Sequence, residues 1–216
     1  MKVNSISIDF KDAVSNLCVL GMKYPTDKCP NNKERALHKH AYTPYYDMLF
    51  SSMRYNNNLL LAEIGIYHNM SMMCWRKYFP HATLYGLEWS NAYIQKAITD
   101  DLYFTHYVNV DVTNKSSVEG AFQGINKKFD IIIEDSTHVF EDQIRVIESV
   151  YDYMKPGGIL IIEDIFLSEK EERYVDELKR VEKYFSSATF VHTNHVFQNS
   201  KDWNNDKLLV LFRNDV

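Results

Sequence analysis

From about residue 59 onward, short continuous apolar runs alternate with longer stretches in which apolar residues recur every three or four positions. Short Ile- and Leu-rich runs bounded by turn residues are typical of strands that a parallel sheet buries on both faces. The predicted strands cover residues 59–66, 83–89, 103–110, 129–134 and 157–162. The spacing of three and four predicts helices after Ser90 and over residues 71–79, 116–122, 140–154 and 169–185.

The two ends of the chain depart from this alternation. Residues 189–193 and 208–213 have the pattern of strands separated by a polar loop, which predicts an antiparallel pair. Residues 1–58 contain a helix-like stretch at 44–52 and are otherwise rich in loops, which predicts an N-terminal cap or lid. The fold class is therefore α/β: a Rossmann-like, seven-stranded, mostly parallel sheet with an antiparallel last strand and helices on both faces. Residues 59–216 form its core.

The composition narrows the class of protein. The 216 residues are 45% hydrophobic, which suits one compact domain with a full core. No apolar stretch approaches the roughly 20 residues needed to cross a bilayer, and the first residues lack the apolar core of a secretory signal. Three scattered cysteines favour a reducing, intracellular setting, and the net charge of -5 argues against nucleic-acid binding. We therefore expect a soluble, cytoplasmic protein that binds neither nucleic acid nor membrane.

Acidic residues close the first three predicted strands. Glu63 and Gly65 end the first, Glu88 the second and Asp111 the third. Ligands of open α/β sheets bind at these strand ends, although a lone acid there is usually a helix cap or a solvated turn. The first loop has Gly65 as its only glycine and lacks the glycine-rich pattern of pyrophosphate-binding loops, which disfavours a dinucleotide dehydrogenase.

Five βα units followed by a terminal β-hairpin, with these acids, resemble the class I S-adenosylmethionine (SAM) methyltransferases. The resemblance implies that Glu63 holds the ammonium group of SAM and that Gly65 lets the backbone approach the cofactor. It implies that Glu88, beside Trp89, binds the ribose hydroxyls, and that Asp111 contacts the adenine amino group.

A second set of polar residues ends the next two strands. Asp135 and His138 follow one strand, and Glu163 and Asp164 follow the other. Carboxylates are the ligands that Mg²⁺ or another divalent cation prefers, and imidazole titrates near neutral pH. We therefore predict a metal site at Asp135, Glu163 and Asp164, with His138 as the general base and Asp135 beside it. A helix cap at residues 136–137 and a solvated strand end are the structural alternatives.

More narrowly, the chain resembles the macrocin- and mycinamicin-type sugar O-methyltransferases, some of whose relatives are domains of larger glycan-synthesis proteins, including those of large DNA viruses. The motifs that carry this resemblance are Thr26-Asp27-Lys28, His40-x-Tyr42 with Tyr45, Glu63-x-Gly65, Trp75-x-x-Tyr78-Phe79-Pro80, Tyr85-Gly86, Asp135-x-x-His138, and Gly157-Gly158 leading to Glu163-Asp164. It implies that a sugar hydroxyl, such as that of a rhamnose-like deoxyhexose in a glycan or glycoside, is methylated. It also implies that Thr26, Lys28 and Tyr42 contact the methionine end of SAM, against the alternative of a solvated surface loop.

Other functions remain open at this point. A catechol-type O-methyltransferase would use similar acids on a similar diol, and a non-catalytic SAM-binding domain would keep only the cofactor acids. A metal-dependent hydrolase would use the second set of carboxylates without SAM. The acceptor is expected to be a small molecule or a glycan, and a homo-oligomer is left open.

Overall fold

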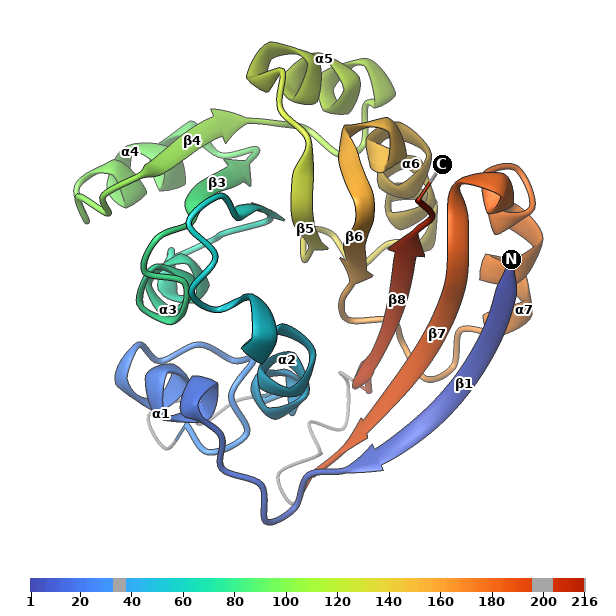
Figure 1. The fold of residues 1–216 in the computed structure, drawn as a ribbon, viewed down its shortest axis with the longest axis horizontal. Helices are drawn as coiled ribbons and strands as arrows, with labels where there is room; N and C mark the ends of the chain where they lie inside the picture. The colour runs from blue at the N-terminus through green and yellow to red at the C-terminus, as the bar shows by residue number, and fades with distance from the viewer. Residues whose placement is uncertain (33–37, 196–203, 216) are drawn as a thin grey trace.

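The computed structural model of the protein describes residues 1–32, 38–195 and 204–215. These residues form a single eight-stranded sheet with the strand order β1-β7-β8-β6-β5-β2-β3-β4 (Figure 1). The strands are β1 (Lys2–Asp9), β2 (Leu60–Ile64), β3 (Thr83–Glu88), β4 (Thr105–Asn109), β5 (Phe129–Glu134), β6 (Met154–Ile162), β7 (Phe185–Asn194) and β8 (Lys207–Arg213). Strand β8 pairs antiparallel with both β6 and β7, and every other pairing is parallel. The predicted fold class is confirmed.

Strand β1 is an addition to the predicted sheet. It pairs in parallel with β7 along its whole length, from Lys2 beside Ser187 to Asp9 beside Asn194. Most of its side chains are exposed, because it is the edge strand and, among the described residues, no further strand pairs with its outer side. Its mostly polar sequence therefore lacks the apolar run that marks the inner strands.

The sequence pattern predicts six of the seven helices in the described residues: it misses α1 (Asn16–Lys23), and it makes one of the six too long. The six are α2 (Tyr42–Phe50), α3 (Met70–Tyr78), α4 (Asn91–Ile98), α5 (Lys115–Ile125), α6 (Phe140–Val150) and α7 (Glu171–Leu178). Short 3₁₀ turns occur at Ser51–Met53, Tyr151–Tyr153 and Glu182–Tyr184. The helix predicted over residues 169–185 is wrong in its length. The chain turns after Leu178 because Val181 and Phe185 are both buried, and Phe185 already begins β7.

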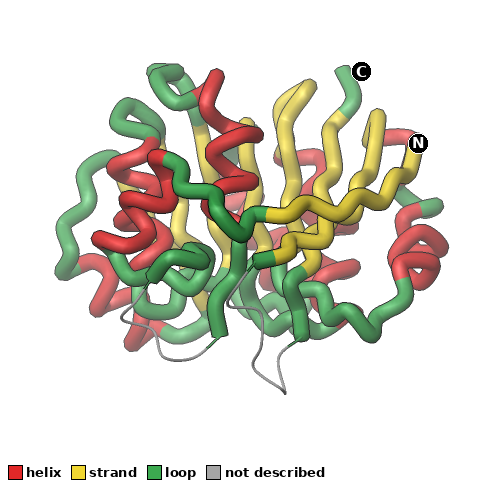
Figure 2. Tube along the Cα trace, turned by 90° about the horizontal axis from the view of Figure 1, so that it is seen from below, coloured by secondary structure: helices red, strands yellow, loops and turns green. Residues whose placement is uncertain are grey.

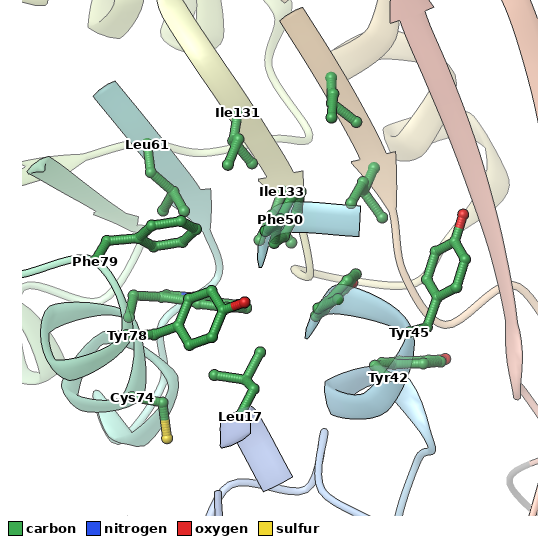
Figure 3. Close-up of a cluster of buried hydrophobic side chains, with 14 of the residues drawn as sticks. Leu17, Tyr42, Tyr45, Phe50, Leu61, Cys74, Tyr78, Phe79, Ile131 and Ile133 are labelled. Atoms are coloured by element: carbon green, nitrogen blue, oxygen red, sulfur yellow. The ribbon is translucent and has the colours of Figure 1, made fainter. Parts of the chain in front are cut away.

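The sheet separates two buried apolar clusters. On one face, side chains of α1, α2 and α3 pack against alternate residues of the inner strands, such as Leu61 and Ile131 (Figure 3). On the other face, α5, α6 and α7 cover the residues between them, such as Ile132 and Leu160. Full burial on both faces explains the continuous apolar runs of β2, β5 and β6.

The N-terminal segment shares the first of these clusters. Leu17 of α1 and Tyr42 and Phe50 of α2 are fully buried in it, together with Trp75 of α3. Phe50 packs against Trp75 with a centroid distance of 6.3 Å. Helices α1 and α2 of the N-terminal segment therefore pack into the same core as the sheet, and the division of residues 1–58 from 59–216 stays a prediction.

The parallel strands all end at the same edge of the sheet. In Figure 2 both marked ends of the chain lie at the upper edge, where β1 begins and the antiparallel β8 ends. The carboxyl ends of β2 to β6 therefore lie at the opposite edge. No helix in residues 1–32, 38–195 and 204–215 is long and apolar enough to cross a membrane.

Candidate active site

A cavity of about 770 Å³ opens at the carboxyl ends of the parallel strands. Its walls are the loops that follow β2 to β6 and one segment of the N-terminal region. Nine of the predicted site residues line it: Thr26, Lys28, Gly65, Glu88, Trp89, Asp111, Asp135, His138 and Asp164. The other three, Glu63, Tyr42 and Glu163, are almost fully buried behind these walls. The structure thus brings together nearly all of the predicted residues, and their individual roles stay predictions.

The part of the cavity formed by Gly65, Glu88, Trp89 and Asp111 is called the β2–β4 half below. Gly65 has a φ of +89°, a backbone conformation that other residues rarely adopt. A Cβ atom there would overlap the carbonyl oxygen of Asp135, so the close contact between the loops after β2 and β5 requires glycine.

Glu88 joins two loops of this half. Its Oε2 accepts a hydrogen bond from the backbone N–H of Tyr67 at 3.1 Å, and its Oε1 accepts one from Ser90 at 3.0 Å. The carboxylate is 4% exposed and lines the cavity. Its remaining lone pairs could accept hydrogen bonds from two hydroxyl groups of a ligand.

Asp111 and Trp89 lie at the rim of the β2–β4 half. The Asp111 Oδ1 accepts hydrogen bonds from the side-chain hydroxyl of Thr113 at 2.7 Å and from its backbone N–H at 3.0 Å, which lower the pKa of Asp111. Trp89 is 73% exposed, so its ring is open to a ligand. Sequence reasoning missed Tyr67 and Tyr93, which also line the cavity and pack edge to face at 5.0 Å. The position of Tyr67 two residues after Gly65, in the same loop, is the available signal.

Asp135, His138 and Asp164 form what is called the β5–β6 half. The imidazole of His138 lies between the two carboxylates, with Nδ1 3.9 Å from Asp135 Oδ1 and Nε2 3.5 Å from Asp164 Oδ2. His138 and Asp164 both have left-handed backbone conformations, with φ of 59° and 57°. Such conformations cost energy in residues other than glycine and concentrate at functional sites.

Each of the two aspartates is anchored through its other oxygen. Asp135 Oδ2 accepts a short hydrogen bond from the Lys28 ammonium. Asp164 Oδ1 accepts one from the Tyr42 hydroxyl at 2.7 Å and lies 3.4 Å from His40 Nε2. The anchoring groups all come from the N-terminal segment, and they leave the inner oxygens of both aspartates directed at His138.

Behind this half lies a buried cluster of charges. The Lys28 ammonium is 2.6 Å from Glu163 Oε2 and 3.5 Å from Glu63 Oε1. Glu163 also accepts a hydrogen bond from Tyr46 at 2.6 Å, and Glu63 accepts one from the Trp75 indole at 2.6 Å. Glu63 and Glu163 thus lie on the sheet face that α1, α2 and α3 cover, rather than in the open cavity.

Burial shifts the pKa values of these groups. It raises the pKa of Glu63, of Glu163 and of Asp135, the last to about 7, while the nearby Lys28 ammonium opposes the rise in each. Burial alone would lower the pKa of Lys28, but Asp135 and Glu163 raise it well above its usual value. Lys28 is therefore a permanent buried cation.

A second ionic group lies next to Asp164. His40 Nδ1 is 3.0 Å from Asp206 Oδ1, and His195 Nε2 is 3.3 Å from the same oxygen. Although burial opposes it, the charges of Asp164 and Asp206 raise the pKa of His40 to about 9. Hydrogen bonds from His195 and His40 lower the pKa of Asp206 to about 2, against the effect of burial. An imidazolium thus bridges Asp164 and Asp206.

Potential metal ligands converge in two places among the described residues. Atoms of Asp135, His138 and Asp164 lie within 4.8 Å of one another, and so do atoms of His38, His40 and Asp206. The first group agrees with two of the three predicted metal ligands. The third predicted ligand, Glu163, is directed at Lys28 and Tyr46 instead.

Sequence reasoning missed several residues that shape this half. Tyr46 follows Tyr42 by four positions and so lies on the same face of α2, which was an available signal. The pairing of His40 with Asp206 joins residues 166 positions apart, and no local pattern indicates it.

Comparisons with known proteins agree with this architecture. Residues 62–165 match the model of a methyltransferase domain. The chain is 25% identical over 134 residues to a mycinamicin VI 2''-O-methyltransferase of Micromonospora griseorubida, a match that covers 59% of this chain and 32% of that protein. It is 26% identical over 137 residues to a demethylmacrocin O-methyltransferase of Streptomyces fradiae, with the same coverage of the two chains.

Among solved structures, the fold resembles that of the MycE methyltransferase from the mycinamycin biosynthetic pathway, solved in complex with Mg, SAH and mycinamycin VI. The TM-score is 0.68 at 20% sequence identity, with 93% of this chain and 55% of that chain covered. The chain thus spans about a third of the curated relatives and about half of this structure. Residues 62–165 are thus similar to a methyltransferase domain, and the chain is similar to O-methyltransferases of the mycinamicin and macrocin type in sequence and to MycE in fold.

Proposed function

We propose that the chain transfers a methyl group from SAM to a hydroxyl of a sugar, with the help of a divalent cation such as Mg²⁺. The observation that carries the proposal is the position of His138 between the inner oxygens of Asp135 and Asp164, in the same cavity as Glu88 and Gly65. The relatives named above, two of which are O-methyltransferases by name, support it. The acceptor would be a deoxyhexose such as rhamnose in a glycan or glycoside.

The β2–β4 half fits the methyl donor. SAM carries no phosphate, so the single glycine after β2 suffices where a pyrophosphate would need a glycine-rich loop. Glu88 would accept hydrogen bonds from the ribose hydroxyls, and Asp111 and Trp89 would contact the adenine end. Glu63 lies behind the wall, so we propose that it acts on the methionine end through Lys28 or Trp75 and not by direct contact.

The β5–β6 half fits a divalent cation. The acidic oxygens of Asp135 and Asp164 converge within 4.8 Å, and hard cations prefer such oxygen ligands. Asp135 and Asp164 would hold the ion, with Glu163 as the third ligand once its carboxylate is free of Lys28. A bound ion would lower the pKa of a nearby hydroxyl and help to orient it.

The residues of the chain would then perform the remaining chemistry. A sugar hydroxyl attacks the methyl carbon of the sulfonium, so that a C–O bond forms, the C–S bond breaks and S-adenosylhomocysteine (SAH) leaves. The hydroxyl proton passes to His138, whose two ring nitrogens face carboxylates that stabilise an imidazolium. Asp135 and Asp164 hold the ring in place, and the cavity walls fix the two reactants at attack distance.

The test combines ligand binding with a panel of acceptors. We expect SAH to bind in calorimetry, and radiolabelled SAM to methylate rhamnosides in the presence of Mg²⁺ but not of EDTA. Asp135→Asn should abolish transfer, whereas the same change at the exposed Asp152 should leave it intact. Transfer to catechols alone would replace the sugar acceptor with a phenol. SAH binding without transfer to any acceptor would indicate a non-catalytic SAM-binding domain and refute the proposal.

A further inference from the structure

Lys28 joins the two halves of the cavity from behind. Its side chain is 2% exposed, and its ammonium contacts carboxylates at the ends of three strands: Glu63 within the end of β2, Asp135 after β5 and Glu163 after β6. Two of these three carboxylates are metal ligands in the proposed function. The ammonium therefore contacts two of the groups that a divalent ion would need.

The backbone of Lys28 is fixed in this position. Its carbonyl oxygen accepts hydrogen bonds from the backbone N–H groups of Tyr42 at 3.1 Å and Thr43 at 3.0 Å, at the start of α2. Its own N–H donates to the Thr26 hydroxyl at 3.4 Å. The ammonium is thus delivered to the carboxylates by an anchored loop, and only the side chain is free to move.

The charges around Lys28 do not balance. Glu63, Asp135 and Glu163 bring three carboxylates to one ammonium, and Asp164 lies close to Asp135 and Glu163. Buried carboxylates without a compensating charge are costly, which raises their pKa values, so this cluster binds either protons or further positive charge. A divalent ion would supply it, but two cations that share the same ligands repel each other strongly in a buried site.

We propose that Lys28 is an internal cation that competes with the divalent metal for Asp135 and Glu163, lowers the affinity of the chain for that metal, and withdraws when the metal binds. This rests on the proposed function, since it takes Asp135 and Glu163 as metal ligands. The Lys28 ammonium can withdraw into the cavity, because Lys28 already lines it beside Thr26 and Asp27. Asp27 is among the charges that act on the Lys28 ammonium.

A metal titration tests the competition. Mn²⁺ binding is measured by the electron paramagnetic resonance signal of the free ion, in wild type, Lys28→Met and Lys28→Arg. Removal of the competing charge should tighten Mn²⁺ binding by about tenfold or more in Lys28→Met, whereas Lys28→Arg keeps the charge and should bind as wild type does. The matched control is Lys155→Met, which removes a lysine paired with Asp130 at 2.7 Å, outside the cavity. Unchanged or weaker Mn²⁺ binding by folded Lys28→Met overturns the proposal.

A second measurement uses wild type alone and does not depend on the folding of a variant. Lysines are acetylated briefly with and without Mg²⁺, and the modification of each is quantified by mass spectrometry. Mg²⁺ should raise the acetylation of Lys28 severalfold, because the released ammonium enters the cavity, while Lys155 stays unchanged. Acetylation of Lys28 that is constant or falls on addition of Mg²⁺ contradicts the withdrawal.

Asp135→Asn distinguishes a failure of the proposed competition from a failure of the proposed metal site. If Asp135→Asn loses Mn²⁺ binding while Lys28→Met binds as wild type does, the metal site stands and the competition is wrong. If wild type and Asp135→Asn bind Mn²⁺ equally, the proposed metal site itself is wrong and the competition fails with it.

Discussion

The β2–β4 half and the β5–β6 half of the cavity share one edge of the sheet but are built on different physical principles. In the β2–β4 half, backbone N–H groups hold the Glu88 carboxylate, and Trp89 and Asp111 are open to solvent. In the β5–β6 half, buried charges hold one another: Lys28 and His40 anchor Asp135 and Asp164. The first arrangement suits recognition of a ligand, and the second suits control of protons and charge.

This difference also shows which part of the chain serves each half. The β2–β4 half is made by residues close in sequence to the strands that carry them. The β5–β6 half depends on Lys28, His40 and Tyr42 from the N-terminal segment, which reach across the α1–α3 face. Changes in the two halves should therefore have separable effects on donor binding and on catalysis.

His138→Ala is expected to separate catalysis from donor binding most clearly. Loss of a general base typically lowers turnover by about 10²- to 10⁴-fold, whereas SAH affinity should stay within about twofold of wild type because His138 lies in the other half. Turnover with SAM and SAH calorimetry provide the two readouts. His81→Ala, at an exposed position far from the cavity lining, is the control. Near-normal turnover of His138→Ala would remove it as the base.

Gly65→Ala should disrupt the β2–β4 half and the β5–β6 half of the cavity at the same time. The new methyl group would meet the Asp135 carbonyl at a backbone φ of +89°, so the loops after β2 and β5 must separate. We expect the free energy of unfolding to fall by about 3 kcal/mol or more, with loss of SAH and Mn²⁺ binding. Gly120→Ala is the matched control: it lies in α5 with no atom near the added Cβ, and it should stabilise by about 0.5–1 kcal/mol. Equal unfolding curves for the two variants would contradict the tight contact.

His40→Gln should affect stability in a pH-dependent way. The pKa of His40 rises from 6.5 to about 9 on folding, so its contribution is complete below pH 6.5 and disappears as the pH rises through 9. Since one pKa unit corresponds to about 1.4 kcal/mol, the contribution is at most about 3 kcal/mol. Urea unfolding of wild type and variant should differ most near pH 6 and least above pH 9. A difference that does not depend on pH would show that the imidazolium bridge is not the source of the stability.

Glu88→Gln should weaken SAH binding by about tenfold, because the amide cannot accept from two hydroxyls and two backbone N–H groups at once. Mn²⁺ binding should be unchanged. Asp111→Asn should have a smaller effect, about threefold or less, because its carboxylate is exposed and screened by water. Calorimetry of both variants tests which substitution weakens SAH binding more. A larger effect at Asp111 would reverse the assignment of the ribose and adenine contacts.

The sequence predicts the inner strands of the sheet better than the edge strand and the last helix. Apolar runs located the inner strands because those strands are buried on both faces, and the acids that follow them necessarily share one edge. Strand β1 was missed because an edge strand needs no apolar run. The apolar spacing predicts too long a helix over 169–185, because periodicity alone does not show that Val181 and Phe185 must turn inward.

Within the cavity, the sequence predicts which residues lie at the site but not where their side chains point. The motif that contains Lys28 marks a residue of the site, but nothing local shows that the ammonium is directed at Glu163 and Asp135. Strand alternation places Glu63 and Glu163 on the α1–α3 face, and only the packed helices reveal that this face is closed there. The pairing of His40 with Asp206 depends on the assembled fold.

The pairing of β1 with β7 has a consequence for the order in which the fold can be completed. Lys2 lies beside Ser187, so these partners are separated by almost the full length of the described chain. The entropy cost of closing such a loop grows only slowly with its length, but the contact cannot form before β7 exists. β1 should therefore dock late, onto a sheet that is otherwise complete. Hydrogen exchange should show its amides as the last of the strand amides to gain protection during refolding.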